Sequence, residues 1–67
     1  MADYQRTKLI KHADDVLRTF TADGLARVTL IDYRSPTVEP LYHVEETFAY
    51  TGILEIPDTI TRQVTLI

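Results

Sequence analysis

The first third of the chain has apolar residues at the spacing of an amphipathic helix. Apolar side chains recur at intervals of three and four residues, which places them on one side of a helical wheel. These residues are Leu9, Ile10, Ala13, Val16, Leu17 and Phe20. Charged residues cluster on the opposite side, and Gly24 suits the left-handed position that ends a helix. The pattern predicts one helix over residues 4–21, with Leu17 and Phe20 buried.

After Gly24 the pattern becomes typical of β-strands. β-Branched and aromatic residues are frequent there, and they fit a pleated, half-buried surface. Apolar and polar residues alternate in segments that are separated by proline or glycine. The predicted strands cover residues 26–33, 41–50, 53–56 and 60–67.

The order of these elements predicts an α+β protein. Short connections favour antiparallel pairing of consecutive strands. We expect one N-terminal amphipathic helix packed on a small, mostly antiparallel sheet or a curled barrel of about four strands. The length of 67 residues suits a single domain, 1–67.

Composition favours a protein that needs a partner. A domain of this size buries little apolar surface and usually relies on a disulfide, a metal or another chain for stability. The sequence has no cysteine, so disulfides and thiolate metal sites are excluded. We expect a protein partner, either a second copy or a larger assembly.

Charge excludes other partners and singles out one segment. The net charge is −3 without a basic cluster, and the apolar runs are short, so we expect neither direct nucleic-acid binding nor a membrane span. The chain begins without a leader pattern, and a cytoplasmic location is expected. Between Arg34 and Arg62 there is no Lys or Arg. This acidic segment is either a docking surface for a basic partner or a solvated face.

Three carboxylates of that segment, Glu39, Glu45 and Glu46, are candidate partner-binding residues. Strand alternation places Glu45 and Glu46 on opposite faces, so they do not form an acid–base pair. Glu46 is in phase with the apolar residues of its strand. A β-bulge that turns Glu46 outward, a sheet end that exposes it, or a buried functional carboxylate would each explain this position, and the first two are favoured.

Residues with catalytic or metal-binding chemistry are sparse. His43 and Glu45 share a strand face and could supply two metal ligands, whereas a structural site typically needs four. Ser35, the only serine, lies between Arg34 and Pro36, outside any nucleophile motif. We therefore expect no enzyme activity, no cofactor and no metal.

Further contact candidates lie at the two ends of the chain. Tyr4 falls on the charged side of the predicted helix, so the core does not explain it. The last predicted strand is apolar to its end at Val64, Leu66 and Ile67. It either pairs only inside its own sheet or adds to the sheet of a neighbouring chain.

A short repeat also involves this last strand. The tetrapeptide VTLI occurs at 28–31 and again at 64–67. It indicates either two equivalent strands or a coincidence in a chain rich in these residues, and the coincidence is favoured.

The layout of a short helix followed by a small all-β unit is similar to that of small virion proteins of tailed bacteriophages, such as head–tail joining proteins. The likeness rests on Leu17 and Phe20 followed by the strand residues 28–30. It implies a phage virion component, located in the virion.

Two functions follow from these observations. The first is a non-enzymatic protein–protein interaction protein that acts as a homo-oligomer or as a subunit of a larger assembly. The alternative is an acidic inhibitor or regulator that binds a basic surface of a partner protein.

Overall fold

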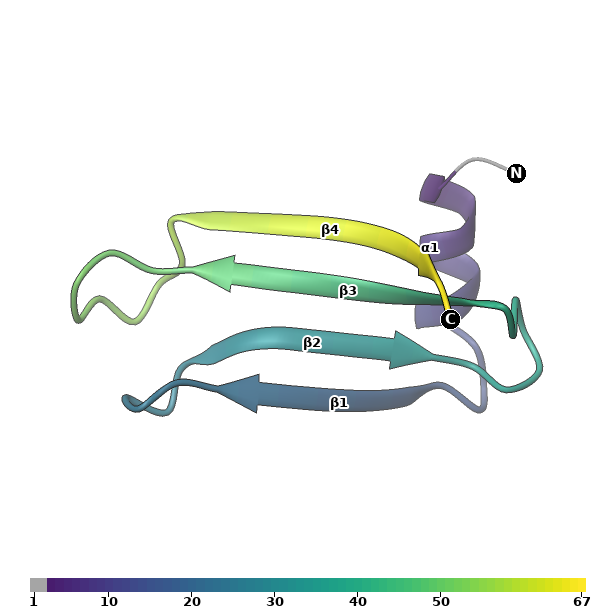
Figure 1. Ribbon diagram of the computed structural model, residues 1–67, viewed down its shortest axis with the longest axis horizontal. Helices are drawn as coiled ribbons and strands as arrows, with labels where there is room; N and C mark the ends of the chain where they lie inside the picture. Colours follow the sequence, from purple (N-terminus) through teal and green to yellow (C-terminus); the bar gives the residue numbers. More distant parts are fainter. Residues whose placement is uncertain (1–2) are drawn as a thin grey trace.

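The computed structural model describes residues 3–67 and shows one helix packed on a four-stranded antiparallel sheet (Figure 1). The predicted α+β fold is confirmed, with an open sheet. The elements are α1 (Asp3–Lys11), β1 (Leu17–Ala22), β2 (Val28–Arg34), β3 (Tyr42–Ala49) and β4 (Thr59–Leu66).

Each strand pairs with the next one along the chain, so the sheet order is β1-β2-β3-β4. All three pairings are antiparallel, and β1 and β4 form the two edges. The barrel alternative is therefore wrong.

The helix is much shorter than predicted, and its second half is a strand. α1 ends at Lys11. The amide of Ala13 donates a hydrogen bond of 3.3 Å to the carbonyl of Ile10, which closes the last turn. The segment that follows the turn pairs along its whole length with β2. Spacing alone fits a helix there, but cross-strand pairing of a threonine-containing segment overrides it. Leu17 and Phe20 are exposed rather than buried, because they lie on an edge strand that the helix does not reach.

The predicted strand 53–56 is also wrong. These residues lie in an irregular loop between β3 and β4, so the fourth strand of the sheet is β1 instead. Gly52 adopts a left-handed conformation with φ of 57°, and Pro57 lacks the amide that a strand ladder requires. The segment between them is too short to return to the sheet.

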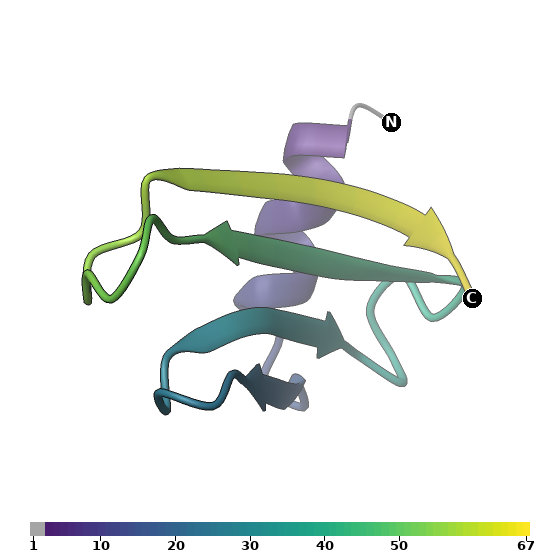
Figure 2. The same ribbon diagram turned by 60° about the vertical axis from the view of Figure 1, so that its left-hand side comes forward.

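The small core lies between α1 and the middle of the sheet. Ile10 and Val44 are completely buried. The helix packs on β2, β3 and β4 but not on β1, and its axis runs across the strands (Figure 2). It covers the end of the sheet at which β2 and β4 finish (Figure 1).

Strand register gives the sheet two different faces. Phe20, Ile31, Glu46 and Arg62 are aligned across the four strands on the helix side. The opposite face is mostly polar, as is usual for the solvated side of an antiparallel sheet. It carries Thr19, Thr21, Asp32, Glu45, Thr47, Thr61 and Gln63.

The two copies of the VTLI tetrapeptide are not equivalent. Val28 lies on the polar side of the sheet, whereas Val64 pairs with Val44 on the helix side. The two segments therefore present opposite faces, which agrees with a coincidental repeat. Within residues 3–67 no helix is long and apolar enough to cross a bilayer.

Candidate interaction surface

The helix leaves one end of its side of the sheet uncovered. Phe48 on β3 pairs with Ile60 on β4 just beyond the helix, and Ile60 remains 54% exposed. Phe20, on the edge strand β1, is 59% exposed. Phe20 and Ile60 are exposed and Phe48 is half-buried, so this part of the sheet presents apolar surface to solvent.

The loop between β3 and β4 adds a second group of exposed apolar residues at the same end. Ile53 is 83% exposed, Ile56 is 78% exposed, and Leu54 lies between them. With Glu55 these side chains line a shallow hollow. We call the two groups together the uncovered apolar surface. It comprises Phe20, Phe48, Ile53, Leu54, Ile56 and Ile60.

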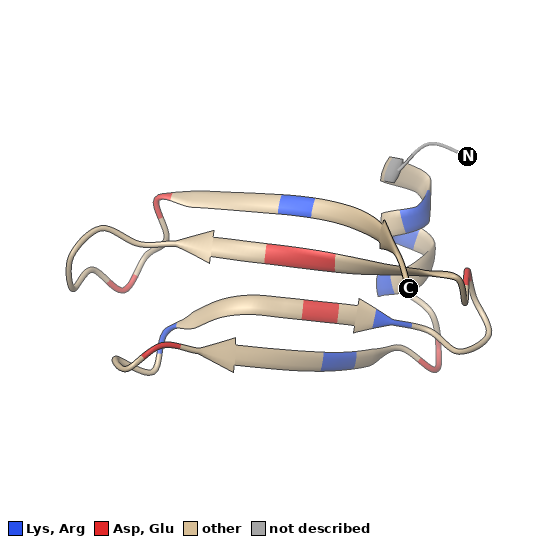
Figure 3. Cartoon of the chain, in the orientation of Figure 1, with Lys and Arg blue, Asp and Glu red and all other residues tan. Residues whose placement is uncertain are grey.

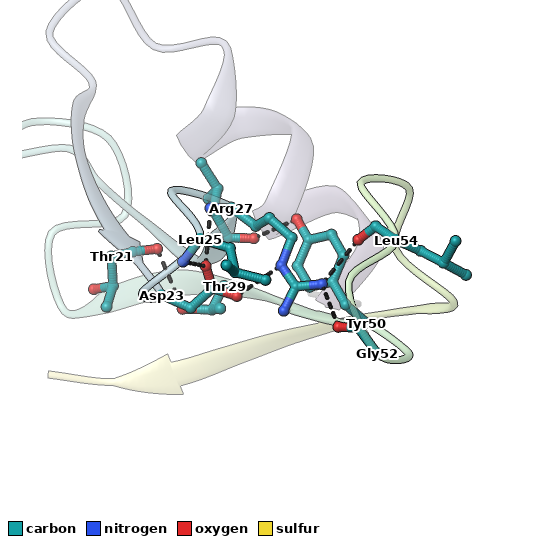
Figure 4. Close-up of polar contacts among 9 residues, drawn as sticks. Thr21, Asp23, Leu25, Arg27, Thr29, Tyr50, Gly52 and Leu54 are labelled. Atoms are coloured by element: carbon teal, nitrogen blue, oxygen red, sulfur yellow. Dashed lines mark hydrogen bonds and ion pairs between the residues drawn. The ribbon is translucent and has the colours of Figure 1, made fainter.

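Arg27 holds this loop in place (Figure 4). Its Nη1 donates hydrogen bonds to the carbonyls of Gly52, at 2.9 Å, and Leu54, at 2.8 Å. Its Nε donates to Asp23 at 2.8 Å, and its guanidinium lies 4.5 Å from the centre of the Tyr50 ring. The loop is therefore fastened to the β1–β2 turn by a largely buried arginine.

Further hydrogen bonds hold Arg27 and Tyr50 themselves. Asp23 accepts hydrogen bonds from the backbone amides of Arg27 and Leu25, at 3.0 and 2.9 Å. The amide of Arg27 is the main reason why the pKa of Asp23 lies below its usual value. The hydroxyl of Tyr50 donates to the carbonyl of Val28 at 2.6 Å. The exposed loop is thus a fixed structure with its apolar side chains outward.

At this end of the sheet, charged residues lie in the connecting segments rather than on the strands. Figure 3 shows the charged residues of the strands in the middle of the sheet and toward the helix, whereas the ends of β3 and β4 near their connecting loop are uncharged. Glu55 and Asp58 lie in the loop itself, at the rim of the uncovered apolar surface. An apolar centre with a polar rim is the usual anatomy of a protein interface.

The predicted partner-binding residue Glu46 lies elsewhere, under the helix. It is 4% exposed and sits in a regular ladder with Arg62 opposite, so it is neither bulged outward nor at a sheet end. Its Oε2 accepts hydrogen bonds from Lys11 Nζ at 3.0 Å and Arg62 Nε at 2.7 Å. Burial raises its pKa, but these donors and Tyr33 outweigh burial, so the pKa lies below its usual value.

The other two predicted carboxylates do not join Glu46. Glu39 lies beside the helix, with its Oε2 3.6 Å from Arg6 Nε. Glu45 lies on the polar face of the sheet, with its Oε1 3.7 Å from His43 Nε2. The three carboxylates therefore form no common docking surface.

Tyr4 and Val64 do come together, because both line a groove between α1 and β4. Leu66 and Ile67 are exposed farther along the same edge. β4 pairs with β3 inside its own sheet, and its other side is a sheet edge.

The residues considered for chemistry have structural partners. His43 Nδ1 lies 2.6 Å from Asp32, and in the part of the chain that the structure describes no three acidic or histidine side chains are placed to hold a metal. Ser35 is buried; its hydroxyl donates to Asp15 at 2.6 Å and accepts from the amide of Val38 at 2.8 Å. These bonds tie the loop after β2 to the turn after the helix.

Sequence reasoning missed the uncovered apolar surface. Alternation cannot tell a buried strand from an exposed apolar loop, so Ile53, Leu54 and Ile56 were assigned to the sheet. The sequence does hold a signal for this loop, because only four residues separate Gly52 from Pro57. Four residues are too few for a strand and the turns on either side of it. The role of Arg27 depends on contacts 25 and 27 residues away, which spacing does not reveal.

Comparison with known proteins found no match among protein-family models, curated proteins or solved structures. The likeness to phage head–tail joining proteins also loses its basis, because Leu17 and Phe20 lie on a strand rather than on a helix.

Proposed function

We propose that this chain is a non-enzymatic subunit that acts by self-association, and that its uncovered apolar surface docks onto the same surface of a second copy. The observation that carries the proposal is the exposure of three large apolar residues, Phe20, Ile60 and the loop residue Ile53, in parts of the protein that the helix does not cover.

The exposed area supports a second copy as the occupant. A compact monomer of 7.7 kDa is expected to expose about 4,300 Å². This chain exposes 4758 Å². The excess, about 460 Å², is a little more than half of the roughly 800 Å² that each partner contributes to a standard interface. Self-association would return the exposed area to the range of a normal small protein.

The rigidity of the loop also supports docking. Association loses affinity when loops must be ordered at the interface. The bonds from Arg27 to Gly52 and Leu54 order this loop before any partner arrives. The cost of ordering is therefore already met within the monomer.

A closed dimer is the simplest assembly that fits this surface. A two-fold contact uses the same patch on both chains, so it needs a surface that complements itself. The ends of β3 and β4 are uncharged, and the nearest carboxylates, Glu55 and Asp58, lie in the loop at the rim of the surface. The acidic-regulator alternative has less support, since Glu39, Glu45 and Glu46 lie in three different places.

Molar mass in solution tests the proposal. We expect light scattering to give twice the chain mass of 7.7 kDa at micromolar concentration. Ile60→Glu should give the monomer, because it places a charge in the centre of the apolar contact. Thr61→Glu is the matched control, since the adjacent residue of the same strand lies on the polar face.

A wild-type chain that stays monomeric at millimolar concentration would refute the proposal. Equal dissociation by Thr61→Glu and Ile60→Glu would also refute it, because the contact would then not be on the helix side. Circular dichroism of both variants checks that each is folded.

A further inference from the structure

The groove between α1 and β4 has the charge and walls of a binding site that the self-association does not use. It encloses about 280 Å³. That volume is just below the range of about 300–1,000 Å³ that is usual for small-molecule sites. Its lining residues are Tyr4, Thr7, Lys8, Lys11, His12, Arg62 and Val64.

The groove is positively charged in an acidic protein. Lys8, Lys11 and Arg62 line it, and Glu46 behind them is the one carboxylate bonded to two of these cations. Three positive charges and one negative charge leave a net charge of +2. The whole chain carries −3, so the positive charge is a local property of the groove.

Glu46 positions two of the cations. Its Oε2 bonds both Lys11 Nζ and Arg62 Nε, so the two cationic groups are held on either side of one oxygen atom. Only the Nε of Arg62 takes part in the hydrogen bonds recorded between residues 3 and 67. The two Nη groups of Arg62 can therefore donate to a ligand, and Lys11 Nζ, which also lies 5.0 Å from the centre of the Tyr33 ring, has further protons to donate.

The third cation that lines the groove is Lys8. Lys8 Nζ is 5.6 Å from the centre of the Tyr4 ring. Tyr4 and Val64 form the apolar part of the lining. The lining thus combines cationic donors for an anion with an apolar wall for an organic group.

We propose that this groove binds a small organic phosphate, with the phosphate between Lys8, Lys11 and Arg62 and the organic group against Tyr4 and Val64. A phosphate monoester dianion matches the +2 charge of the groove, and an arginine fork with lysine point charges is a common phosphate-binding arrangement.

Phenyl phosphate is the probe, because it carries the dianion on a compact apolar ring. Amide chemical shifts of the wild-type protein, recorded by NMR at low salt, should move in α1 and around Arg62. Benzoate has the same ring with a single charge, and inorganic phosphate has the charge without the ring. We expect phenyl phosphate to bind more tightly than either.

Lys8→Gln is the main variant, since the recorded contact of Lys8 is with the exposed Tyr4 and its loss should spare the fold. It should weaken phenyl phosphate binding about fivefold, the loss that corresponds to about 1 kcal/mol for a partly exposed charge pair. Arg34→Gln removes the same charge from the end of β2, away from the groove, and should leave binding unchanged.

Equal weakening by Lys8→Gln and Arg34→Gln would overturn the proposal, because it would mean general attraction to positive charge. Shifts outside the groove, or no binding at millimolar phenyl phosphate, would overturn it as well. If inorganic phosphate binds as tightly as phenyl phosphate, the assignment of the organic group to Tyr4 and Val64 is wrong. Ile60→Glu should retain binding, which separates this test from that of self-association.

Discussion

Among single residues, Glu46 illustrates how a charge is kept under a helix. Its carboxylate is almost completely buried, yet it receives hydrogen bonds from Lys11, Arg62 and Tyr33. A buried carboxylate that is paired with cationic donors is tolerated, and without it Lys11 and Arg62 would repel each other.

Reversal of charge should therefore destabilise the protein to very different extents at two adjacent residues. Glu46→Lys should lower the free energy of unfolding by about 3–5 kcal/mol, since it buries a third cation beside Lys11 and Arg62. Glu45→Lys should lower it by less than about 1 kcal/mol, because Glu45 is partly exposed on the polar face. Urea denaturation measures both. Similar losses would show that the two residues do not face opposite sides of the sheet.

The pH dependence of stability follows from four shifted groups. The pKa values of Asp15, Asp23 and Glu46 lie below their usual values. The main cause is a hydrogen bond from Ser35 for Asp15 and a hydrogen bond from the amide of Arg27 for Asp23. For Glu46, hydrogen bonds from Lys11 and Arg62 outweigh the effect of burial. Burial, with Glu46 as a hydrogen-bond partner, raises the pKa of Tyr33.

Stability should be constant in the neutral range and should fall at both extremes. A lowered pKa stabilises the fold above the ordinary values of 3.8 and 4.5, and this contribution is lost as the pH falls through the folded pKa values. A raised pKa stabilises the fold below 10.0, and this is lost as the pH rises through the folded value.

Thermal melts across the pH range measure this dependence. Tyr33→Phe should remove the part of the alkaline decrease that is due to the phenol, and Glu46→Gln should flatten the acid limb. An acid limb that is unchanged in Glu46→Gln would contradict the assigned role of this carboxylate.

At the scale of elements, the two halves of the predicted helix should contribute unequally to the free energy of unfolding. Ile10→Ala should lower the free energy of unfolding by about 2–5 kcal/mol, because it opens a cavity in the small core. Leu17→Ala should lower it by less than about 1 kcal/mol, since Leu17 is exposed on the edge strand β1. Guanidinium denaturation compares the two. A larger loss for Leu17→Ala would contradict the position of β1 at the sheet edge.

The loop between β3 and β4 depends on a single side chain of the facing turn. Arg27→Lys keeps the charge but cannot reproduce the fork that bonds Asp23 and two loop carbonyls. Hydrogen exchange of amides in residues 51–57 should become faster, while the amides in the middle of β3 keep their protection. Arg34→Lys serves as the control, because Arg34 is exposed at the end of β2. Unchanged exchange in Arg27→Lys would show that the loop is held by other contacts.

Sequence reasoning predicted β2, β3 and β4 well because each alternates clearly between the two faces. It missed β1 because the positions of Leu17 and Phe20 fit a helix as well as a strand, and only pairing with β2 decides between them. It placed Glu46 in the correct phase but not with its partners. Lys11 lies 35 residues away in the chain, and no local pattern reveals that contact.

In the molecule as a whole, the open sheet leaves backbone groups unpaired at its edges, and the short helix leaves apolar side chains exposed. The edges of β1 and β4 expose backbone groups, and the uncovered apolar surface exposes side chains. The proposed dimer would cover the apolar side chains, and the groove between α1 and β4 lies outside the surface that it would use. The two proposed activities are therefore compatible in one assembly.

The order of the strands also has a consequence for the way the chain folds. Each strand pairs with its neighbour in sequence, so hairpins can form with short loop closures, whereas the helix must dock across the sheet from the other end of the chain. We expect the sheet to form in the transition state and the helix to dock after it. Ile10→Ala should then mainly accelerate unfolding, and a substitution in the β2–β3 pair, such as Ile31→Val, should mainly slow folding. Stopped-flow kinetics distinguish the two, and slower folding of Ile10→Ala would place the helix in the folding nucleus instead.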